Sequence, residues 1–346
     1  MSKANVTIQD IARHAGVGVG TVSRVINASP KVDPATRQHV QAVIAELGYR
    51  PKSAAKILRT RKTHEIGFIT DEIATTPFAV DVIRGAQDAA WAQGKLLVLI
   101  NTNRNSQVLE AAIETMLERQ VEGLLYAAMF HQQVSLPANI YELPAVLVDC
   151  FCEDRSLPSV VPNEIQGSYV ATELLLQQGH RRIGHMTNVE LYPARTGRIA
   201  GYQQALSDYG VVYEPTLLCE EWTDPQGGYR AAKRLMQQEN RPTALFCFND
   251  RMAMGTYAAL NELGLRIPED VAIVSYDNQE LLAANLRPTL TSMQLPHYAM
   301  GQWAVNYLLN STNHNDSSAP PQVTLECPLV IRESHGKELH SGTKTI

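Results

Sequence analysis

Apolar residues near the N-terminus recur with the spacing of short amphipathic helices. The first predicted helix begins after Thr7, a candidate N-cap with Asp10 three residues later, and ends at Gly16. The second covers positions 19–27. Two helices joined by a turn of only Gly16 and Val17 predict a helix-turn-helix. The inward-facing residues of this pair are Ile8, Ile11, Ala12, Ala15, Val22, Val25 and Ile26.

A third helix is predicted directly after this pair. Asp33 is its candidate cap, Pro34 occupies its first turn, and Gly48 follows its last apolar residue. Its apolar stripe consists of Val40, Val43, Ile44 and Leu47. Positions 1–50 are therefore expected to fold as a three-helix head.

The rest of the chain alternates between strand-sized apolar runs and helical stretches. Expected strands cover 65–70, 95–100, 121–127, 145–149, 181–187, 243–249 and 270–277. Expected helices cover 80–93, 106–119, 165–178, 198–209, 225–238 and 250–263. Such alternation is typical of parallel sheets with crossover helices, and there is enough of it for two sheets. The fold class is thus α/β, with a helical head before a core of two parallel sheets.

Length and composition agree with this organisation. The 346 residues correspond to roughly two domains and a small module. No apolar run is long enough to span a membrane, and the first ten residues lack a secretory signal. Five cysteines without a CxxC pair give neither a disulfide framework nor a zinc cluster. We expect a cytoplasmic protein with no membrane association, no metal and no cofactor.

Charge is distributed unevenly along the chain. Positions 1–62 hold eleven basic and three acidic residues, a formal charge of +8, whereas the remainder holds 19 basic and 32 acidic residues, or −13. A small basic module on a large acidic body indicates binding to a polyanion, with double-stranded DNA as the leading candidate. The alternative is a solvated basic face without a partner.

A helix-turn-helix places its second helix in the major groove, where base edges present a distinct pattern. The residues expected to contact bases are Val19, Gly20, Thr21 and Arg24. Short polar side chains suited to phosphate oxygens are those of Thr7, Ser23, Asn27 and Thr36. The alternative is a three-helix bundle that binds no DNA.

The segment after the head, positions 51–62, is predicted to be a hinge. Its helix-compatible stretch 52–59 is too short to be stable alone in water and is expected to form on binding. Leu58 could wedge between base steps of the minor groove while Lys56 and Arg59 contact phosphates and Ala55 lies beside it. The alternative is a plain interdomain linker.

Polar residues follow the predicted strands of the core at their carboxyl ends, where open parallel sheets bind ligands. These residues are Asp71, Asn101, Asp149, Thr187, Asn249 and Asp277. Carboxylates and an amide converging on one crevice suit a polyhydroxylated ligand. Asp149 and Asp277 could instead be helix caps. No nucleophile, base and orienting group form a catalytic set, so we expect no enzyme.

Several motifs of this chain, in the same order, are similar to those of the LacI/GalR (lactose repressor) family. In the head and hinge they are the runs 6–12, 21–27 and 47–51, and in the core the runs 179–183, 198–202, 248–250 and 268–277. The resemblance extends from Val6 to about Arg332. One departure is that Gly18, Val19 and Gly20 stand where family members often carry polar or larger residues, which leaves the operator sequence undetermined.

The resemblance implies a two-lobed core of the periplasmic-binding-protein type over 63–346. Its N-subdomain would comprise about 63–161 and 292–324, and its C-subdomain about 162–291 and 325–335. Effector positions carried over by motif are Arg198, Asn249 and Asp277, with Asp149 and Trp222 matched less closely and Phe78 placed to close the pocket. Alternatively, Trp222 belongs to the core, and Arg198 forms a structural ion pair with an acid such as Asp250.

The function expected from these features is that of a ligand-responsive transcription regulator. It would act as a homodimeric repressor of carbohydrate-utilisation genes on an inverted-repeat operator, with a sugar between the lobes changing the hinge geometry. A nucleoside or purine is the alternative effector. A sugar receptor that binds no DNA is the alternative class of protein.

Overall fold

The computed structural model describes residues 6–49, 63–75, 79–311 and 319–336. The chain divides into two compact units, residues 1–63 and 64–346, here called the head and the core. Within the part of the chain that is described, no helix is both long and apolar enough to cross a membrane.

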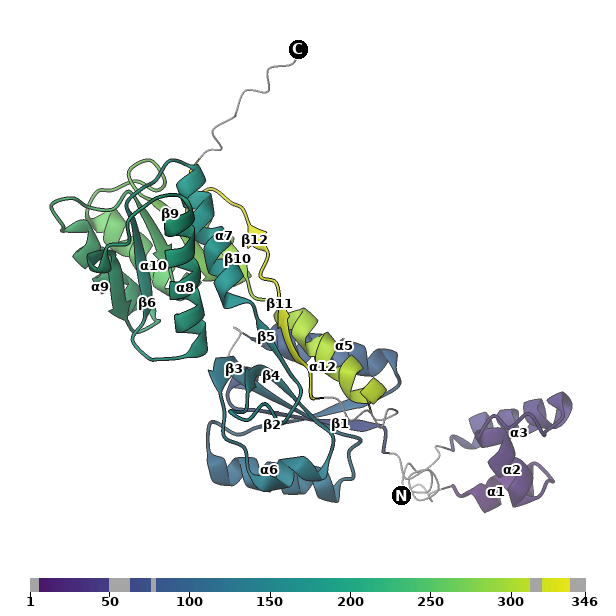
Figure 1. Ribbon diagram of the computed structural model, residues 1–346. Helices are drawn as coiled ribbons and strands as arrows, with labels where there is room; N and C mark the ends of the chain where they lie inside the picture. Colours follow the sequence, from purple (N-terminus) through teal and green to yellow (C-terminus); the bar gives the residue numbers. More distant parts are fainter. Residues whose placement is uncertain (1–5, 50–62, 76–78, 312–318, 337–346) are drawn as a thin grey trace, which may run out of the picture. The chain divides into compact units, whose positions relative to one another are not determined.

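The head consists of the three predicted helices, α1 (Ile8–His14), α2 (Val19–Ile26) and α3 (Pro34–Leu47) (Figure 1). Thr7 and Asp10 form a reciprocal capping box at the start of α1. Gly48 ends α3 in the left-handed conformation with φ 62°, which favours glycine. The helices enclose a core of Ile11, Ala12, Ala15, Val22, Val25, Val32, Val40 and Val43.

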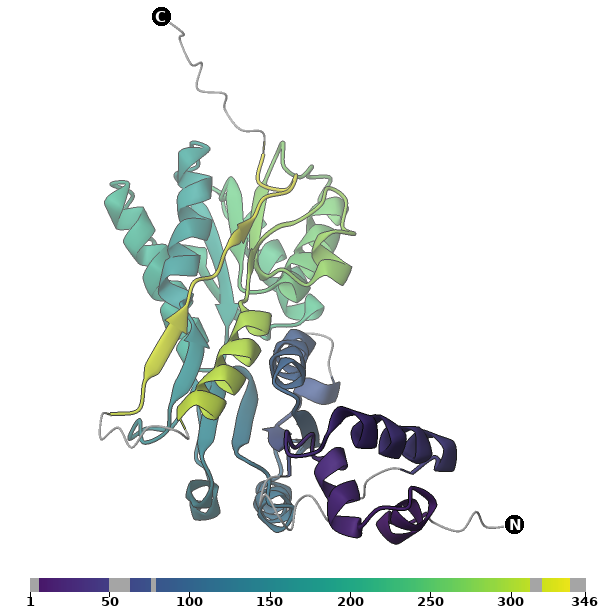
Figure 2. The same ribbon diagram turned by 90° about the vertical axis from the view of Figure 1, so that its right-hand side faces the viewer.

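The first sheet of the core is entirely parallel and has the order β11-β5-β4-β3-β1-β2. Its strands are β1 (Glu65–Thr70), β2 (Leu96–Asn101), β3 (Leu124–Gln133), β4 (Ala145–Phe151), β5 (Ser159–Pro162) and β11 (Gln322–Leu325). Helices α5 (Val80–Ala92) and α12 (His297–Ser311) lie side by side over one face, and α6 (Ser106–Glu118) covers the other (Figures 1 and 2).

The second sheet has the order β12-β10-β9-β8-β6-β7 and is parallel except for its edge strand β12. Its strands are β6 (Ile183–Asn188), β7 (Leu218–Glu221), β8 (Ala244–Cys247), β9 (Ala272–Asp277), β10 (Thr291–Gln294) and β12 (Leu329–Val330). The helices are α7 (Glu164–Gln177), α8 (Pro193–Asp208), α9 (Pro225–Met236), α10 (Asp250–Glu262) and the short α11 (Glu280–Ala283).

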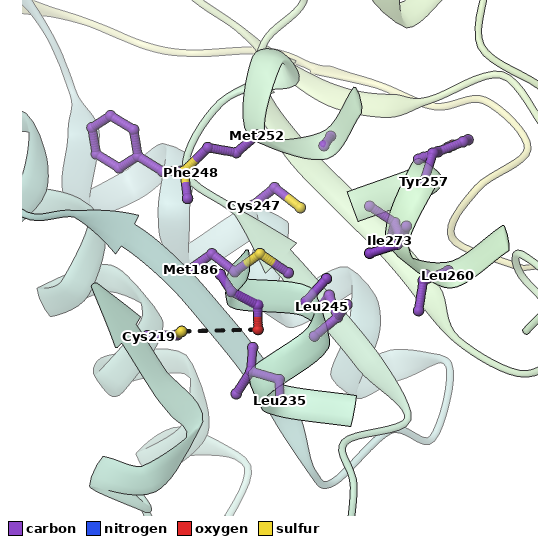
Figure 3. Close-up of a cluster of buried hydrophobic side chains, with 14 of the residues drawn as sticks. Met186, Cys219, Leu235, Leu245, Cys247, Phe248, Met252, Tyr257, Leu260 and Ile273 are labelled. Carbon is purple, nitrogen blue, oxygen red and sulfur yellow. Dashed lines mark hydrogen bonds between the residues drawn. The ribbon is translucent and has the colours of Figure 1, made fainter. Parts of the chain in front are cut away.

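Alternate residues of the strands fill the two faces of this second sheet. On β8, Ala244 and Phe246 pack with α7 and α8, whereas Leu245 and Cys247 pack with α9 and α10. Figure 3 shows the second of these layers, in which Leu235, Met252 and Leu260 meet Met186 and Ile273 of the sheet. A strand buried on both faces reads as a continuous apolar run, which is why β6, β8 and β9 could be predicted from the sequence.

The chain passes between the two sheets three times. The passages follow β5, β10 and β11, since β10 pairs with β9 and β12. The middle passage therefore comes after Gln294 rather than near position 291, and the predicted N-subdomain boundary at 292 falls inside β10. Helix α12 and strands β5, β7, β10, β11 and β12 were not predicted from the sequence.

Candidate functional site

The residues expected to contact bases occupy the exposed side of α2. Val19 is 43% exposed, Gly20 and Arg24 are exposed, and Thr21 is half-buried. Val22 and Val25 on the opposite side are buried in the head. Gly18 at the N-cap has no side chain to cap α2, and the Thr21 N–H donates to the Gly18 carbonyl at 2.8 Å.

The residues expected to contact phosphates take part in local hydrogen bonds. The Thr7 hydroxyl donates to Asp10 Oδ2 at 2.6 Å, and Asn27 Nδ2 donates to the Ser23 carbonyl at 2.6 Å. The backbone N–H of Thr36 donates to Asp33 Oδ1 at 2.9 Å. Thr7 and Asn27 are thus the cap residues of α1 and α2, and Thr36 lies in the capped first turn of α3. The hinge residues Ala55, Lys56, Leu58 and Arg59 lie outside the described residues.

The core contains a cavity of about 110 Å³ at the carboxyl ends of β4, β6, β8 and β9. Four predicted site residues line it together: Asp149, Arg198, Asn249 and Asp277. Asp71, Asn101 and Thr187 are not among the residues that line it. Phe78 lies outside the described residues.

Arg198, from the second turn of α8, is held in place by contacts on several sides. Its Nε donates to Glu164 Oε2 at 2.7 Å and its Nη2 to Glu164 Oε1 at 3.4 Å. Nη1 donates to the Phe248 carbonyl at 2.5 Å and lies 3.8 Å from Asp277 Oδ1. The guanidinium carbon is 4.2 Å from the ring centre of Phe248 and 3.8 Å from that of Tyr276. The ion-pair alternative is thus realised with Glu164, while Arg198 still faces the cavity.

Burial and charge act in opposite directions on the ionisable groups around Arg198. Burial lowers the pKa of Arg198, but the charges of Glu164 and Asp277 outweigh it and raise that pKa above its ordinary value. Burial raises the pKa of Asp277 well above its usual range, although the Arg198 charge opposes this.

Asp149 and Asp277 do not cap helices. Strand β4 continues past Asp149 to Phe151, and α11 begins only after Gln279. The backbone φ of both residues is positive, 58° for Asp149 and 101° for Asp277. This conformation is unusual for non-glycine residues and is often found at functional sites. Asp149 is 1% exposed, and its Oδ1 has no hydrogen-bond partner within the described part of the chain. This oxygen is an acceptor available to a ligand.

Asn249 is the residue that caps a helix. Its Oδ1 accepts a hydrogen bond from the Met252 N–H at 2.8 Å, and its Nδ2 donates to the Thr223 carbonyl at 3.2 Å. The amide is thereby fixed at the start of α10 with one N–H and one lone pair left for a ligand. The neighbouring ring of Phe248 belongs both to the cavity wall and to the hydrophobic layer drawn in Figure 3.

Trp222 does not line the cavity. Its side chain is 55% exposed at the end of β7, and only the next residue, Thr223, reaches the cavity wall. The Trp222 backbone is held close to α9, since a Cβ on Gly227 would come within 1.9 Å of the Trp222 carbonyl oxygen. The stacking of its ring on a ligand stays a prediction that this cavity does not support, and the alternative that Trp222 belongs to the core is wrong.

Sequence reasoning missed four acidic or basic residues of the cavity lining, His131, Glu164, Glu190 and Arg251, of which Glu190 and Arg251 are exposed. Glu164 is the first residue of α7, and no motif around it indicates that it faces Arg198. His131 lies on β3, where its Nδ1 is buried with no hydrogen-bond partner among the described residues. Burial lowers the pKa of His131, so the imidazole is neutral at pH 7 and presents both a donor and an acceptor. Its position in a polar stretch after an apolar strand was the only available signal.

Comparison with known proteins identifies both units. Residues 7–52 match the bacterial regulatory proteins of the lacI family, and residues 63–333 match the periplasmic binding proteins and sugar binding domain of the LacI family. The chain belongs to the LacI family. It is therefore a DNA-binding transcriptional regulator with a ligand-binding core, and members of this family are regulators rather than enzymes.

Similar LacI-family proteins cover nearly the whole chain. The ribose operon repressor of Haemophilus influenzae is 34% identical over 95% of this chain and 98% of its own length. The HTH-type transcriptional repressor PurR of Pasteurella multocida is 32% identical, with the same two coverages. Among solved structures, the lac repressor dimer bound to operator and the anti-inducer ONPF has a TM-score of 0.80 at 25% identity, covering 96% of this chain and 100% of that one.

Proposed function

We propose that the protein is a cytoplasmic repressor that binds an inverted-repeat operator as a homodimer. A basic head with an exposed second helix supports DNA binding, and the lac repressor, a structural relative, is a dimer on its operator. Two copies of α2 related by a two-fold axis would read two half-sites about one helical turn apart. Val19, Gly20, Thr21 and Arg24 would contact bases, while Thr7, Ser23, Asn27 and Thr36 would contact phosphates.

The effector is a sugar or sugar derivative bound in the core cavity. The observation that carries this proposal is that Asp149, Asp277 and Arg198 meet in one cavity, because carboxylates accept from vicinal hydroxyls and a guanidinium donates to them. The cavity volume of about 110 Å³ is smaller than the roughly 300–1,000 Å³ of pockets that bind drug-sized molecules. The cavity therefore suits a small ligand. Relatives point the same way, namely a ribose operon repressor and a regulator solved in complex with cellobiose.

A purine or nucleoside is the second candidate effector. Phe130 on β3 and Tyr192 before α8 line the cavity with 4.7 Å between their ring centres, and Phe248 after β8 lines it as well. Aromatic faces of this kind stack on planar bases, and several relatives are named PurR. The unpaired carboxylate oxygen of Asp149 favours the sugar.

Ligand and operator binding are coupled through the segment between head and core. We propose that the ligand changes the relative position of the two sheets, which alters the spacing of the paired hinge segments and their minor-groove contacts through Ala55, Lys56, Leu58 and Arg59. Coupling free energies of this kind are roughly 1–3 kcal/mol, which corresponds to about a 5-fold to 150-fold change in operator affinity.

A thermal-shift screen over sugars, nucleosides and purine bases tests the choice of effector. A ligand at roughly 100 times its dissociation constant stabilises the core by about 2.7 kcal/mol, which raises the melting temperature measurably. A variant that lacks residues 1–62 should retain the shift and lose all DNA binding. A shift produced only by purines would contradict the sugar proposal.

A further inference from the structure

The charge of Arg198 is already neutralised within the protein. Glu164 receives two hydrogen bonds from its guanidinium, at 2.7 and 3.4 Å, and the two side chains are only 3–4% exposed. With Nη1 also donating to the Phe248 carbonyl, three of the five N–H groups have partners. A buried, bidentate pair of this kind keeps its geometry far better than an exposed one.

The packing of two helices fixes Glu164 in this place. Glu164 begins α7 directly after the cap Asn163, and α8 crosses close by with glycines at its contact positions. A Cβ on Gly197 would come within 2.6 Å of the Glu164 Cβ, and one on Gly201 within 2.1 Å of the Ile165 carbonyl oxygen. The backbones of α7 and α8 approach closely, which restricts the rotamers of Glu164. Its carboxylate is therefore held against Arg198.

The remaining charged groups of the cavity are mostly acidic. Besides Glu164, its described lining includes Asp149, Glu190 and Asp277, and the only other cation is Arg251, which is exposed. Burial lowers the pKa of His131, so its imidazole adds no positive charge at pH 7. A phosphate or carboxylate group on a ligand would therefore meet mainly carboxylates, with only the exposed Arg251 as a further cation in the described lining. Like charges brought together in this way disfavour binding strongly.

We propose that the cavity selects uncharged polyhydroxylated ligands and excludes their phosphate esters, and that Glu164 is the positioning residue that sets this preference. Glu164 acts through Arg198: it holds the guanidinium ready to donate to hydroxyls and withholds its net charge from an anionic ligand. This inference rests on the proposed function, because it assumes that the cavity is the effector site.

Calorimetric titration of the full-length protein with matched pairs of ligands tests the inference. The pairs are D-ribose with D-ribose 5-phosphate and D-glucose with D-glucose 6-phosphate. Glu164→Gln removes the charge at nearly constant shape, Glu164→Asp keeps the charge, and Glu114→Gln, on the exposed side of α6, is the matched control. The melting temperature of each variant checks its folding.

We expect the wild type to bind the neutral member of a pair at least about 100-fold more tightly than its phosphate ester. Glu164→Gln should reduce that ratio by roughly 10-fold or more, with tighter binding of the ester, because Arg198 regains a net charge. Glu164→Asp and Glu114→Gln should keep the ratio high. A purely structural role for Glu164 would weaken both ligands equally and leave the ratio unchanged.

Two results would overturn the inference. One is that the wild type binds the phosphate ester as tightly as the neutral sugar. This measurement needs no variant, so it is decisive even if Glu164→Gln fails to fold. The other is an unchanged ratio in a folded Glu164→Gln. In both cases sugar binding, and with it the proposed function, would stand. If no member of any pair binds although the protein still holds an operator, both the inference and the sugar effector fail, while DNA binding remains.

Discussion

Asp250, the first residue of α10, accepts a hydrogen bond from the hydroxyl of Ser292 on β10 at 2.7 Å. Its other oxygen accepts from the Gln279 backbone N–H at 2.6 Å, and the side chain is completely buried. Asp250 thus ties the first turn of α10 to the strand that precedes the passage between the sheets. Burial raises its pKa to about 6, with opposing contributions from these hydrogen bonds and from Arg332.

This pKa predicts a pH dependence of stability. The folded protein binds a proton on Asp250 more tightly than the unfolded chain, whose Asp pKa is about 4. Proton binding therefore adds stability that is fully present below about pH 4 and is lost as the pH rises through about 6. Asp250→Asn, which does not titrate, should show a weaker gain in unfolding free energy between about pH 7 and pH 5 than the wild type does.

Urea unfolding of the core at several pH values measures this difference. The exposed Asp154→Asn is the control and should follow the wild type. Asp277, whose pKa burial also raises, changes stability in the same direction. Histidines whose pKa burial lowers, such as His185, change it in the opposite direction in both proteins, so the difference between the two curves reports Asp250. Parallel curves for wild type and Asp250→Asn would show that Asp250 is not protonated in this range.

Asp149→Asn is expected to weaken ligand binding without unfolding the core. The substitution replaces the charged carboxylate, whose buried Oδ1 has no partner among the described residues, with a neutral amide. A ligand hydroxyl would then lose a hydrogen bond to a charged group, which is worth about 1.5–3 kcal/mol. We therefore expect a loss of affinity of roughly 10-fold or more, measured by calorimetry with the ligand found in the screen. An equal loss in Asp154→Asn, or full affinity in Asp149→Asn, would remove Asp149 from the site.

Arg24→Ala should reduce operator affinity much more than affinity for random DNA. A bidentate contact from an arginine to guanine contributes about 1–3 kcal/mol of discrimination, so specific binding should fall by roughly 5-fold to 150-fold. Arg13→Ala removes the same charge from α1, where Arg13 lies 3.4 Å from Asp10, and should lower both affinities alike. Fluorescence anisotropy with both duplexes distinguishes them. Identical specific losses in the two variants would mean that Arg24 contacts only the backbone.

Gly197→Ala is predicted to destabilise the core and to disturb the Glu164–Arg198 pair. The new methyl group would lie 2.6 Å from the Glu164 Cβ, so the two helices must separate, at a cost of about 1–3 kcal/mol. Urea unfolding should show this loss, together with weaker ligand binding. Ser207→Ala, at an exposed position of the same helix, should change neither. Wild-type stability in Gly197→Ala would show that the helices can move apart freely.

Local signals allowed much of the fold to be predicted from the sequence. Thr7, Asp33 and Gly48 mark helix ends because capping depends on residues a few positions apart, and the buried strands read as apolar runs. Helix α12 and the short strands β5 and β10 carry weaker patterns, because their place depends on pairing with distant segments. The middle passage was misplaced for this reason.

The candidate site was predicted only in part, because some of its residues are placed by contacts between distant segments. Ligands bind at the carboxyl ends of parallel strands, so Asp149 on β4 of the first sheet and Asp277 on β9 of the second could each be assigned to a ligand-binding edge. The expectation that both edges face one cavity came from the family resemblance. Trp222 could not be oriented, because the bend after β7 depends on the contact of its backbone with Gly227. Glu164 and His131 escaped notice because nothing near them in the sequence shows that they face Arg198 or the cavity.

Selection of binding sites by the full-length protein from a pool of random duplexes tests the central claim most directly. The central claim is that the basic head reads a specific operator under control of a ligand in the core. The account predicts enrichment of an inverted repeat whose affinity for the protein changes about 5-fold to 150-fold when the ligand is added. Recovery of no sequence above the random pool at physiological salt, with or without ligand, would contradict it.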